Sequence, residues 1–267
     1  MLKEVNKKYV KLKRALTRRR SPKYLASFKS TSSTLNGIVA YNKHGGYFTP
    51  LSSQKRPAVQ KVLKGKVHEP ETVNFIRAHC GKGDIIHAGT FFGDFLPPLS
   101  HALSDEAKVW AFEPNSENYR CAHITLLIND LSNVKLYNCG LGDESSTSNM
   151  LIESENGATL GGGSRIINEE KDGKTIEVNV KRVDDVVGKD RIVTILQLDV
   201  EGYEKQALTG ALNIINRCKP ILILEDNKGV IGTNWFKENI SSIGYEIKGK
   251  LHQNTVLGIP TIHDFSF

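Results

Sequence analysis

The sequence predicts an α/β domain with a mostly parallel sheet and helices on both faces, extending from about Cys80 to Leu257. Three observations predict this fold class. Short apolar runs alternate with helical segments from Asp84 onward, the first run leads into a bend with two glycines, and later runs end in acidic residues. The expected strands are Ile85–Ala88, Val109–Glu113, Val134–Cys139, Ile176–Lys181, Thr194–Asp199 and Ile221–Glu225, and the expected helices are Pro98–Leu103, Ser116–Asn129 and Tyr203–Arg217.

Residues 1–79 are predicted to form an extension, separate from a domain that covers residues 80–267. Residues 1–30 contain eleven Lys or Arg and one acid. Apolar side chains recur among them at helical spacing, which predicts a basic amphipathic helix. Such a helix can bind an anionic membrane surface or an acidic partner through residues 1–20, or it can pack on its own domain or on a second subunit of a homo-oligomer. The apolar stripe is Leu2, Val5, Tyr9, Leu12 and Leu16; a Ser/Thr-rich linker at 30–34, a hairpin around Asn42–Gly46 and helices over Ala58–Leu63 and Pro70–His79 are predicted to follow.

Charge and composition exclude several classes of protein. The chain carries a net charge of +7, but the first 30 residues contribute +10, so the remainder is at −3. A nucleic-acid-binding domain would itself be basic. No apolar run approaches the roughly 18–20 residues of a membrane span, and no signal peptide is recognised, so we expect a cytoplasmic protein, peripheral to a membrane if the basic helix binds one. The four cysteines form no C-x-x-C pair and indicate neither a zinc site nor a disulfide framework.

The first expected strand ends in a bend that runs from His87 through Gly89, Thr90, Phe92 and Gly93 to Asp94. In an open α/β sheet, ligands bind beyond the carboxyl ends of the strands, at such a first turn. A glycine there lets the backbone approach a ligand closely. Taken alone, the bend is equally well explained as a structural turn.

The next expected strand ends in Glu113-Pro114-Asn115, and Glu113 lies 24 residues after Gly89. An acid about 20 residues past the glycine turn is placed to accept hydrogen bonds from ribose hydroxyls. The spacing G-x-x-x-G differs from the G-x-G-x-x-G that holds a pyrophosphate, and Asp94 would repel that group. Asp94 suits the amino group of a methionine moiety instead. The pair of motifs therefore favours S-adenosylmethionine (SAM) over NAD.

Further candidate residues follow three later strands. Cys139, Gly140 and Leu141 can form a wall against an adenine ring, or a simple turn. Carboxylates close together repel one another, which indicates a use such as holding a cation, binding hydroxyls or accepting a proton. Helix capping is the alternative for two of them, Glu201 and Glu204. These acids are Asp199, Glu201 and Glu204 after one strand and Glu225 and Asp226 after the next.

Together these motifs resemble the FkbM-type methyltransferases, over roughly Gly83 to Asp226. The resemblance implies a Rossmann-like class I methyltransferase fold, SAM as cofactor, and O-methylation of a sugar in a glycan, glycolipid or nucleotide-sugar-derived acceptor. The family usually has Asp, supporting the methionine end of SAM, where this sequence has His87. The matching pieces are Gly89–Asp94, Ala111–Asn115, Gly140–Asp143, Val183–Val186 and Leu198–Glu204.

The expected catalytic residues are Asp199, Glu225 and Glu201, with Asp199 or Glu225 accepting the proton of a sugar hydroxyl. No metal ligand is assigned, although Mg²⁺ held by Asp199, Glu225 and Asp226 is a further candidate cofactor. A glycine-rich segment between Glu153 and Lys174 either closes over a substrate or forms a disordered insertion. Rival functions are a nucleic-acid (RNA cap or ribose) methyltransferase, an NAD-dependent oxidoreductase and a binding module with a decayed site. The expected SAM contacts are His87, Gly89, Thr90, Phe92, Gly93, Asp94, Glu113, Pro114, Asn115, Cys139, Gly140, Leu141 and Asp199.

Overall fold

A computed structural model describes residues 34–167, 169 and 172–265 of the chain. The compact unit that contains the sheet begins at Leu35, so the hairpin and the two helices before Cys80 belong to the same unit as the strands that follow. The predicted amphipathic helix and most of the linker lie outside the described residues. No helix in the described part of the chain has both the length and the apolar character needed to cross a bilayer.

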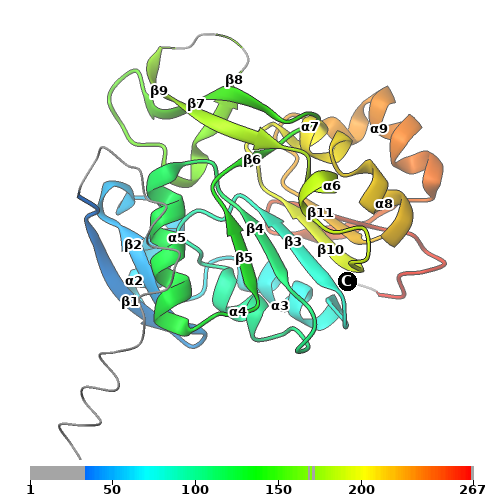
Figure 1. Ribbon diagram of the computed structural model, residues 1–267, viewed down its shortest axis with the longest axis horizontal. Coiled ribbons are helices and arrows are strands. Elements are labelled where there is room, and N and C mark those ends of the chain that lie inside the picture. The colour runs from blue at the N-terminus through cyan, green and yellow to red at the C-terminus, as the bar shows by residue number, and fades with distance from the viewer. Residues whose placement is uncertain (1–33, 168, 170–171, 266–267) are drawn as a thin grey trace, which may run out of the picture. The chain divides into compact units, whose positions relative to one another are not determined.

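A seven-stranded sheet forms the centre of this unit (Figure 1). All neighbouring strands are parallel except for the reversed β13, and the chain changes direction across the sheet between β3 and β10. This arrangement confirms the Rossmann-like α/β fold. The strand order reverses between the paired strands β3 and β10, and such sheets bind ligands beyond the carboxyl ends of the strands at this switch point. The order is β12 (Glu246–Leu251), β13 (Asn254–Gly258), β11 (Ile221–Leu224), β10 (Val193–Leu198), β3 (Asp84–Ala88), β4 (Val109–Phe112) and β5 (Val134–Tyr137).

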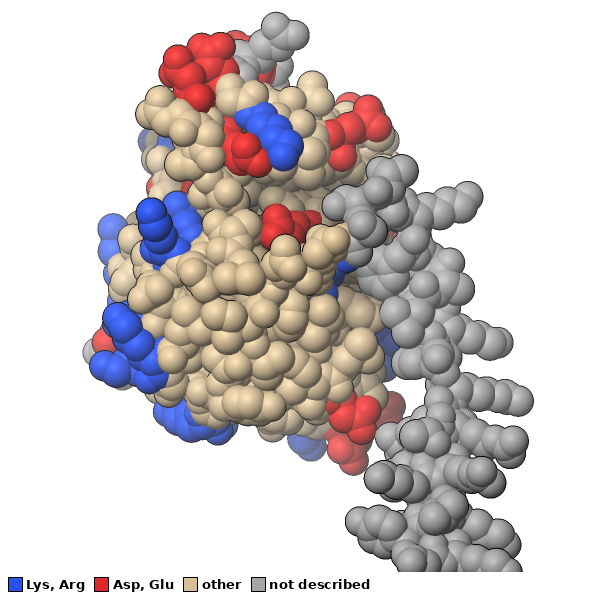
Figure 2. All heavy atoms as spheres, turned by 90° about the vertical axis from the view of Figure 1, so that its left-hand side faces the viewer, with Lys and Arg blue, Asp and Glu red and all other residues tan. Residues whose placement is uncertain are grey.

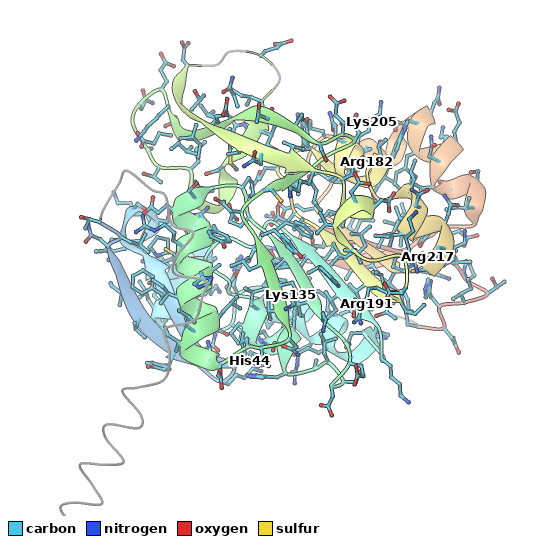
Figure 3. All side chains as sticks on the ribbon, viewed as in Figure 1. His44, Lys135, Arg182, Arg191, Lys205 and Arg217 are labelled. Atoms are coloured by element: carbon cyan, nitrogen blue, oxygen red, sulfur yellow. The ribbon has the colours of Figure 1, made fainter. Side chains whose placement is uncertain are left out.

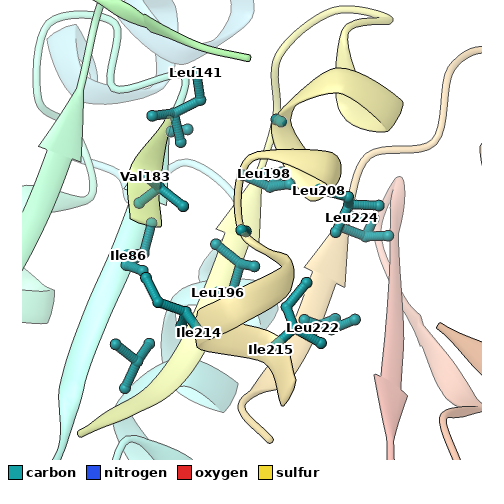
Figure 4. Close-up of a cluster of buried hydrophobic side chains, with 14 of the residues drawn as sticks. Ile86, Leu141, Val183, Leu196, Leu198, Leu208, Ile214, Ile215, Leu222 and Leu224 are labelled. Atoms are coloured by element: carbon teal, nitrogen blue, oxygen red, sulfur yellow. The ribbon is translucent and has the colours of Figure 1, made fainter. Parts of the chain in front are cut away.

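Helices cover both faces of the sheet, as predicted, because alternate residues of each strand point to opposite faces. Ile86, Leu196 and Leu222 lie in one core with α6, α7 and α8 (Figure 4). Ile85 and Ile195 lie in the other core, with α3, α4 and α5. The helices are α3 (Pro70–His79), α4 (Leu96–Ser100), α5 (Ser116–Asn129), α6 (Val183–Val186), α7 (Glu204–Thr209), α8 (Leu212–Cys218) and α9 (Asn234–Asn239).

Two predicted helices differ from those observed. The helix expected over 203–217 is two helices, α7 and α8, because Gly210 packs so closely on the backbone of Gly142 that a side chain there would collide with its carbonyl. The Asp184 carboxylate then accepts hydrogen bonds from the first amides of α8, at 2.9 and 3.0 Å. The helix expected over 98–103 is the shorter α4, which begins two residues earlier.

A second, four-stranded sheet follows β5, in the order β6 (Gly140–Leu141), β9 (Gly173–Lys181), β7 (Ser146–Ser154) and β8 (Arg165–Ile167). It has a small core of its own and stands above the carboxyl ends of β3 and β4 in Figure 1. A short 3₁₀ turn, Gly161–Gly163, connects β7 to β8. The described residues of the glycine-rich segment therefore include the end of β7, this turn, β8 and the start of β9, at the edge of the main sheet where β3 and β4 end.

The hairpin of β1 (Gly37–Asn42) and β2 (Gly45–Pro50) packs beside α5 (Figure 1). The Phe48 amide donates to Thr125 Oγ1 at 3.1 Å, and Asn129 Nδ2 donates to the Gly46 carbonyl at 2.6 Å. The helix α2 (Pro57–Leu63) completes a core of its own with this hairpin and with Phe91 and Phe92 of the glycine bend. Residues 35–63 are thereby brought against the predicted cofactor turn.

Candidate active site

Two connected cavities lie at the carboxyl ends of β3, β4 and β10. The larger has a volume of about 840 Å³ and the smaller, a narrow slot, about 30 Å³. Gly89, Gly162 and Asp199 line both, so the glycine bend and the end of β10 form the junction between them. This is the place where the strand order predicts a ligand site.

Glu113 lies directly on the glycine bend. Its Oε2 accepts a hydrogen bond from the Phe91 amide at 2.7 Å, and its Oε1 accepts one from the Asn115 amide at 2.8 Å. Burial raises the pKa of this carboxyl to about 7. Oε1 also accepts from Asn118 Nδ2 at 3.5 Å, whereas Oε2 retains a second lone pair that is free to accept from a ligand hydroxyl in the slot that Glu113 lines.

The two glycines of the bend have different roles. Both have positive φ, 87° at Gly89 and 85° at Gly93, and Phe91 between them has φ 51°. A side chain at Gly89 would collide with the backbone carbonyl of Asp199, so this glycine lets the ends of β3 and β10 meet at the cavity junction. A Cβ at Gly93 would lie 3.3–3.4 Å from Ala122 of α5, which indicates a packing role.

The slot is narrow and mostly apolar. Side chains from β6, β7 and β8 and from the loops after β4 and β10 form its walls, and Glu113 also lines it. A volume of 30 Å³ holds only one or two water molecules, so a purine can enter only if the Gly161–Gly163 turn or a wall side chain moves outward. The walls are Pro114, Leu141, Met150, Ile166, Val200 and Tyr203.

Three acids predicted to be catalytic share the floor of the larger cavity: Asp199, Glu201 and Glu225. Burial, together with the neighbouring carboxylates of Glu225 and Glu201, raises the pKa of Asp199 well above its usual value. Asp199 Oδ1 is buried and has no hydrogen-bond partner among the described residues. Glu201 has a left-handed backbone conformation with φ 52°, which residues other than glycine rarely adopt. Such strained conformations are concentrated at functional sites.

The two remaining predicted acids stabilise turns. Glu204 is buried, and its Oε1 accepts a hydrogen bond from the Gly202 amide at 3.0 Å, in agreement with the capping alternative. The Asp226 carboxylate accepts from the amides of Val230 and Ile231 at 2.6 and 3.1 Å. Within the described ranges, no three side chains of the kinds that bind metals form a group that could hold an ion, so Mg²⁺ finds no support.

His87 is among the residues that line the larger cavity. Its Nδ1 donates a hydrogen bond to the Gln197 side-chain oxygen, which can only accept, so Nε2 is left as an acceptor. Burial lowers the pKa of this imidazole to about 4, which keeps it uncharged at neutral pH. The ring stacks on Phe95, and Nε2 is buried with no partner in the part of the chain that the structure describes.

Asp94 lines the same cavity. Burial, and to a smaller extent Glu69, raises the pKa of its carboxyl to about 7. Glu69 is itself held by hydrogen bonds from Thr72 Oγ1 at 3.1 Å and Asn254 Nδ2 at 2.8 Å. His87 and Asp94 therefore both face the space beside Gly89.

Five of the predicted cofactor residues line neither cavity: Thr90, Phe92, Gly93, Asn115 and Cys139. Asn115 caps α5, its Oδ1 accepting from the Glu117 amide at 2.9 Å, and its Nδ2 donates to Ser164 Oγ at 3.3 Å. Phe92 and Cys139 are buried in two different cores. The structure places these residues behind the cavity walls, where they support the residues that form them.

A family model described as "Methyltransferase FkbM domain" matches residues 79–243, which is more than half of the chain. The chain belongs to the FkbM methyltransferase family. The resemblance of its glycine bend and acidic strand ends to that family is thus confirmed, and membership indicates a SAM-dependent methyltransferase.

Three solved structures are distantly similar to this FkbM-family chain. The FkbM methyltransferase from Methylobacillus flagellatus KT is 20% identical with a TM-score of 0.46, over 66% of this chain and 43% of that one. A putative rRNA methylase from Clostridium thermocellum is 10% identical with a TM-score of 0.43, over 70% and 91% of the two chains. The tRNA (uracil-54, C5)-methyltransferase from Pyrococcus abyssi, in complex with S-adenosyl-L-homocysteine, is 13% identical with a TM-score of 0.42, over 86% and 47%.

The match therefore spans less than half the length of the Methylobacillus protein. No curated protein sequence matches the chain.

Several residues that line the larger cavity were not predicted. Arg56, Lys61, Lys66 and His68 come from the segment before Cys80, outside the matched family region. Lys and Arg in a polar segment look like ordinary surface residues, so nothing in their spacing indicated a site. Gln197 did carry a signal, because a polar side chain inside the apolar run of β10 must find a partner in the core.

Proposed function

We propose that this FkbM-family protein transfers the methyl group of SAM to a hydroxyl of a sugar. One observation carries the proposal. The slot bordered by Glu113 shares Gly89, Gly162 and Asp199 with a larger cavity that Glu201 and Glu225 also line. A cofactor in the slot and a polyhydroxylated acceptor in the larger cavity would meet at Asp199.

Binding of SAM in this arrangement assigns a role to each nearby group. Glu113 accepts hydrogen bonds from the ribose hydroxyls, and the apolar walls of the slot enclose the adenine. His87 Nε2 and the Asp94 carboxylate face the amino group of the methionine. A neutral imidazole in place of the family's usual Asp keeps an acceptor there without adding another negative charge to a crowded site.

Methyl transfer itself requires alignment and removal of one proton. SAM supplies a methyl group on a sulfonium, which is a good leaving group, so the protein mainly positions the acceptor oxygen in line with it. With SAM bound, the sulfonium would supply the methyl group to that oxygen and leave as a neutral thioether, and Asp199 would accept the hydroxyl proton. A raised pKa makes Asp199 a stronger base than an ordinary aspartate. Glu201 and Glu225 accept hydrogen bonds from other hydroxyls of the sugar.

Methylation of RNA is a second candidate function. The observation that favours it is a group of basic side chains around the larger cavity, because phosphate contacts need Lys and Arg. Against it, the chain beyond residue 30 carries a net charge of −3.

Incubation with labelled SAM and a panel of monosaccharides, sugar phosphates, nucleotide sugars, glycans and short RNAs tests the proposal. We expect a sugar product that is heavier by one CH₂.

Asp199→Asn should lower turnover by about a hundredfold while S-adenosylhomocysteine still binds. Glu113→Gln should instead weaken S-adenosylhomocysteine roughly tenfold or more, as expected for the loss of a charge-assisted hydrogen bond. Glu177→Gln, an exposed acid on β9, is the control. Labelling of RNA and of no sugar would overturn the proposal.

A further inference from the structure

One wall of the larger cavity is basic. Lys43 follows β1, Arg56 immediately precedes α2, Lys61 lies in α2, and Lys66 follows that helix. None of the four makes a salt bridge with a described acidic residue. Figure 2 shows basic side chains gathered along one margin of the hairpin side of the molecule. Arg56 is near enough to Glu201 to lower the pKa of that carboxyl in part, although the two form no salt bridge. Like charges held together repel one another, so this wall favours an anionic ligand.

The basic wall and the acidic floor belong to the same cavity. The floor consists of Asp199, Glu201 and Glu225 at the ends of β10 and β11, whereas the wall comes from residues 43–66. A neutral ligand would leave these four cations without an ion-pair partner, and an anionic group on the floor would be repelled. The ligand that satisfies both has hydroxyls at one end and a negative charge at the other.

Arg56 is the most firmly placed of the four cations. It is half-buried, and the Gly161–Gly163 turn packs on it so closely that a side chain at Gly163 would collide with Nη2 of the guanidinium. A Cβ at Gly161 would likewise lie 2.6 Å from Ser53 Oγ and 3.1 Å from Arg56 Cγ. The absence of side chains on this turn leaves room for a guanidinium at the cavity wall. Its side-chain N–H groups have no acceptor among the described residues, although a half-buried cation normally has one.

We infer that the acceptor sugar carries a phosphate group, and that Arg56 and Lys61 bind this phosphate while the sugar hydroxyls face Asp199. The inference rests on the proposed function and narrows its substrate class. A phosphate ester carries a charge of about −1.5 to −2 and three acceptor oxygens, which matches several convergent donors better than a single carboxylate does. A sugar 1-phosphate and a nucleotide sugar present the same chemistry.

Calorimetric titration of the full chain, saturated with S-adenosylhomocysteine, tests the inference. The probes are inorganic pyrophosphate, glucose 1-phosphate, UDP-glucose, glucose and a short RNA. We expect the three phosphate-bearing small molecules to bind, with affinity that falls as salt rises, and glucose to bind at least tenfold more weakly. A difference in affinity between glucose 1-phosphate and UDP-glucose shows whether the site prefers the phosphate of a sugar phosphate or that of a nucleotide sugar.

Arg56→Gln and Lys61→Gln should each weaken binding of these phosphates about tenfold or more. Arg77→Gln on α3 and Lys135→Gln on β5 (Figure 3) are controls, since both side chains are exposed and line neither cavity. A melting temperature close to that of the wild type shows that the variants are folded.

Three outcomes would overturn the inference: glucose binding as tightly as glucose 1-phosphate, Arg56→Gln weakening S-adenosylhomocysteine and not pyrophosphate, or the RNA binding more tightly than every small phosphate. The proposed function fails in a different way. Phosphate binding at Arg56 without methyl transfer to any sugar would overturn the proposed sugar methylation and leave the phosphate site standing.

Discussion

At the scale of single residues, the site depends on three acids that line one cavity. Asp199, Glu201 and Glu225 share one cavity floor, and burial is the main cause of the raised pKa of Asp199 and of Glu201. Two carboxylates that share a site titrate as a pair, with one proton held more tightly than usual. A base with a raised pKa is active only above that pKa, so acidity of the medium controls the proposed reaction.

A pH profile of turnover at saturating SAM follows from this. We expect kcat to rise with pH and level off above the pKa of Asp199, because only the ionised carboxylate accepts the proton. Glu225→Gln removes a negative neighbour that raises this pKa, so its rising limb should move to lower pH. Saturation with SAM keeps titration of Glu113, whose pKa is about 7, out of the measurement. A rising limb that stays in place in Glu225→Gln would exclude Asp199 as the titrating base.

At the scale of elements, the ends of β3 have different roles. Its carboxyl end carries the glycine bend, whereas its first residue, Asp84, is a buried acid that ties three segments together. The Asp84 carboxylate accepts hydrogen bonds from the Lys108 amide at 2.9 Å, from Trp110 Nε1 at 2.7 Å and from Arg191 Nε at 2.7 Å. Arg191 precedes β10 at this same end of the sheet (Figure 3). This network holds β4 and β10 in register with β3, far from the cavity.

Asp84→Asn should lower the free energy of unfolding by about 3–5 kcal/mol, because it leaves a partly buried guanidinium without its counter-charge. The amide also cannot accept from all the donors that the carboxylate serves. Chemical denaturation measures the change. The matched control is Asp105→Asn, because Asp105 is an exposed acid in the loop between α4 and β4. Equal stabilities of the two variants would show that the network contributes little.

At the scale of the whole molecule, residues 35–79 belong to the same compact unit as the family domain. Tyr47, Val59 and Val62 pack on Phe91 and Phe92 of the glycine bend. Helix α3 adds its apolar face to the core beneath β3 and β10. The segment that lies outside the family match thus packs on the glycine bend and supplies the basic wall of the larger cavity.

A chain that begins at Leu35 should therefore unfold cooperatively with a melting temperature near that of the full chain. A chain that begins at Cys80 should lose its cooperative transition. The core around Phe91 and Phe92 and the core beneath β3 and β10 would both expose apolar surface that is now buried. Circular dichroism during heating measures both. A cooperative transition in the shorter chain would show that residues 80–265 fold without the segment before them.

The sequence by itself determined the α/β class, most strands, the glycine bend and the acids at the strand ends. These features are local, because an apolar run, a glycine spacing or an acid after a strand is written in consecutive residues. The sequence alone did not predict β7, which depends on pairing with β9. It also did not predict the break between α7 and α8, where Gly210 packs on the backbone of Gly142.

Only the tertiary structure decided what surrounds the site. It separated acids that face the cavity, such as Asp199, from acids that cap turns, such as Glu204, although the two follow the same strand. It also brought Arg56 across from the hairpin side to the cavity that Asp199 lines. The physical reason is that a charged side chain has the same local sequence signature on a solvated surface as on a cavity wall, and only packing between distant segments determines which of the two it occupies.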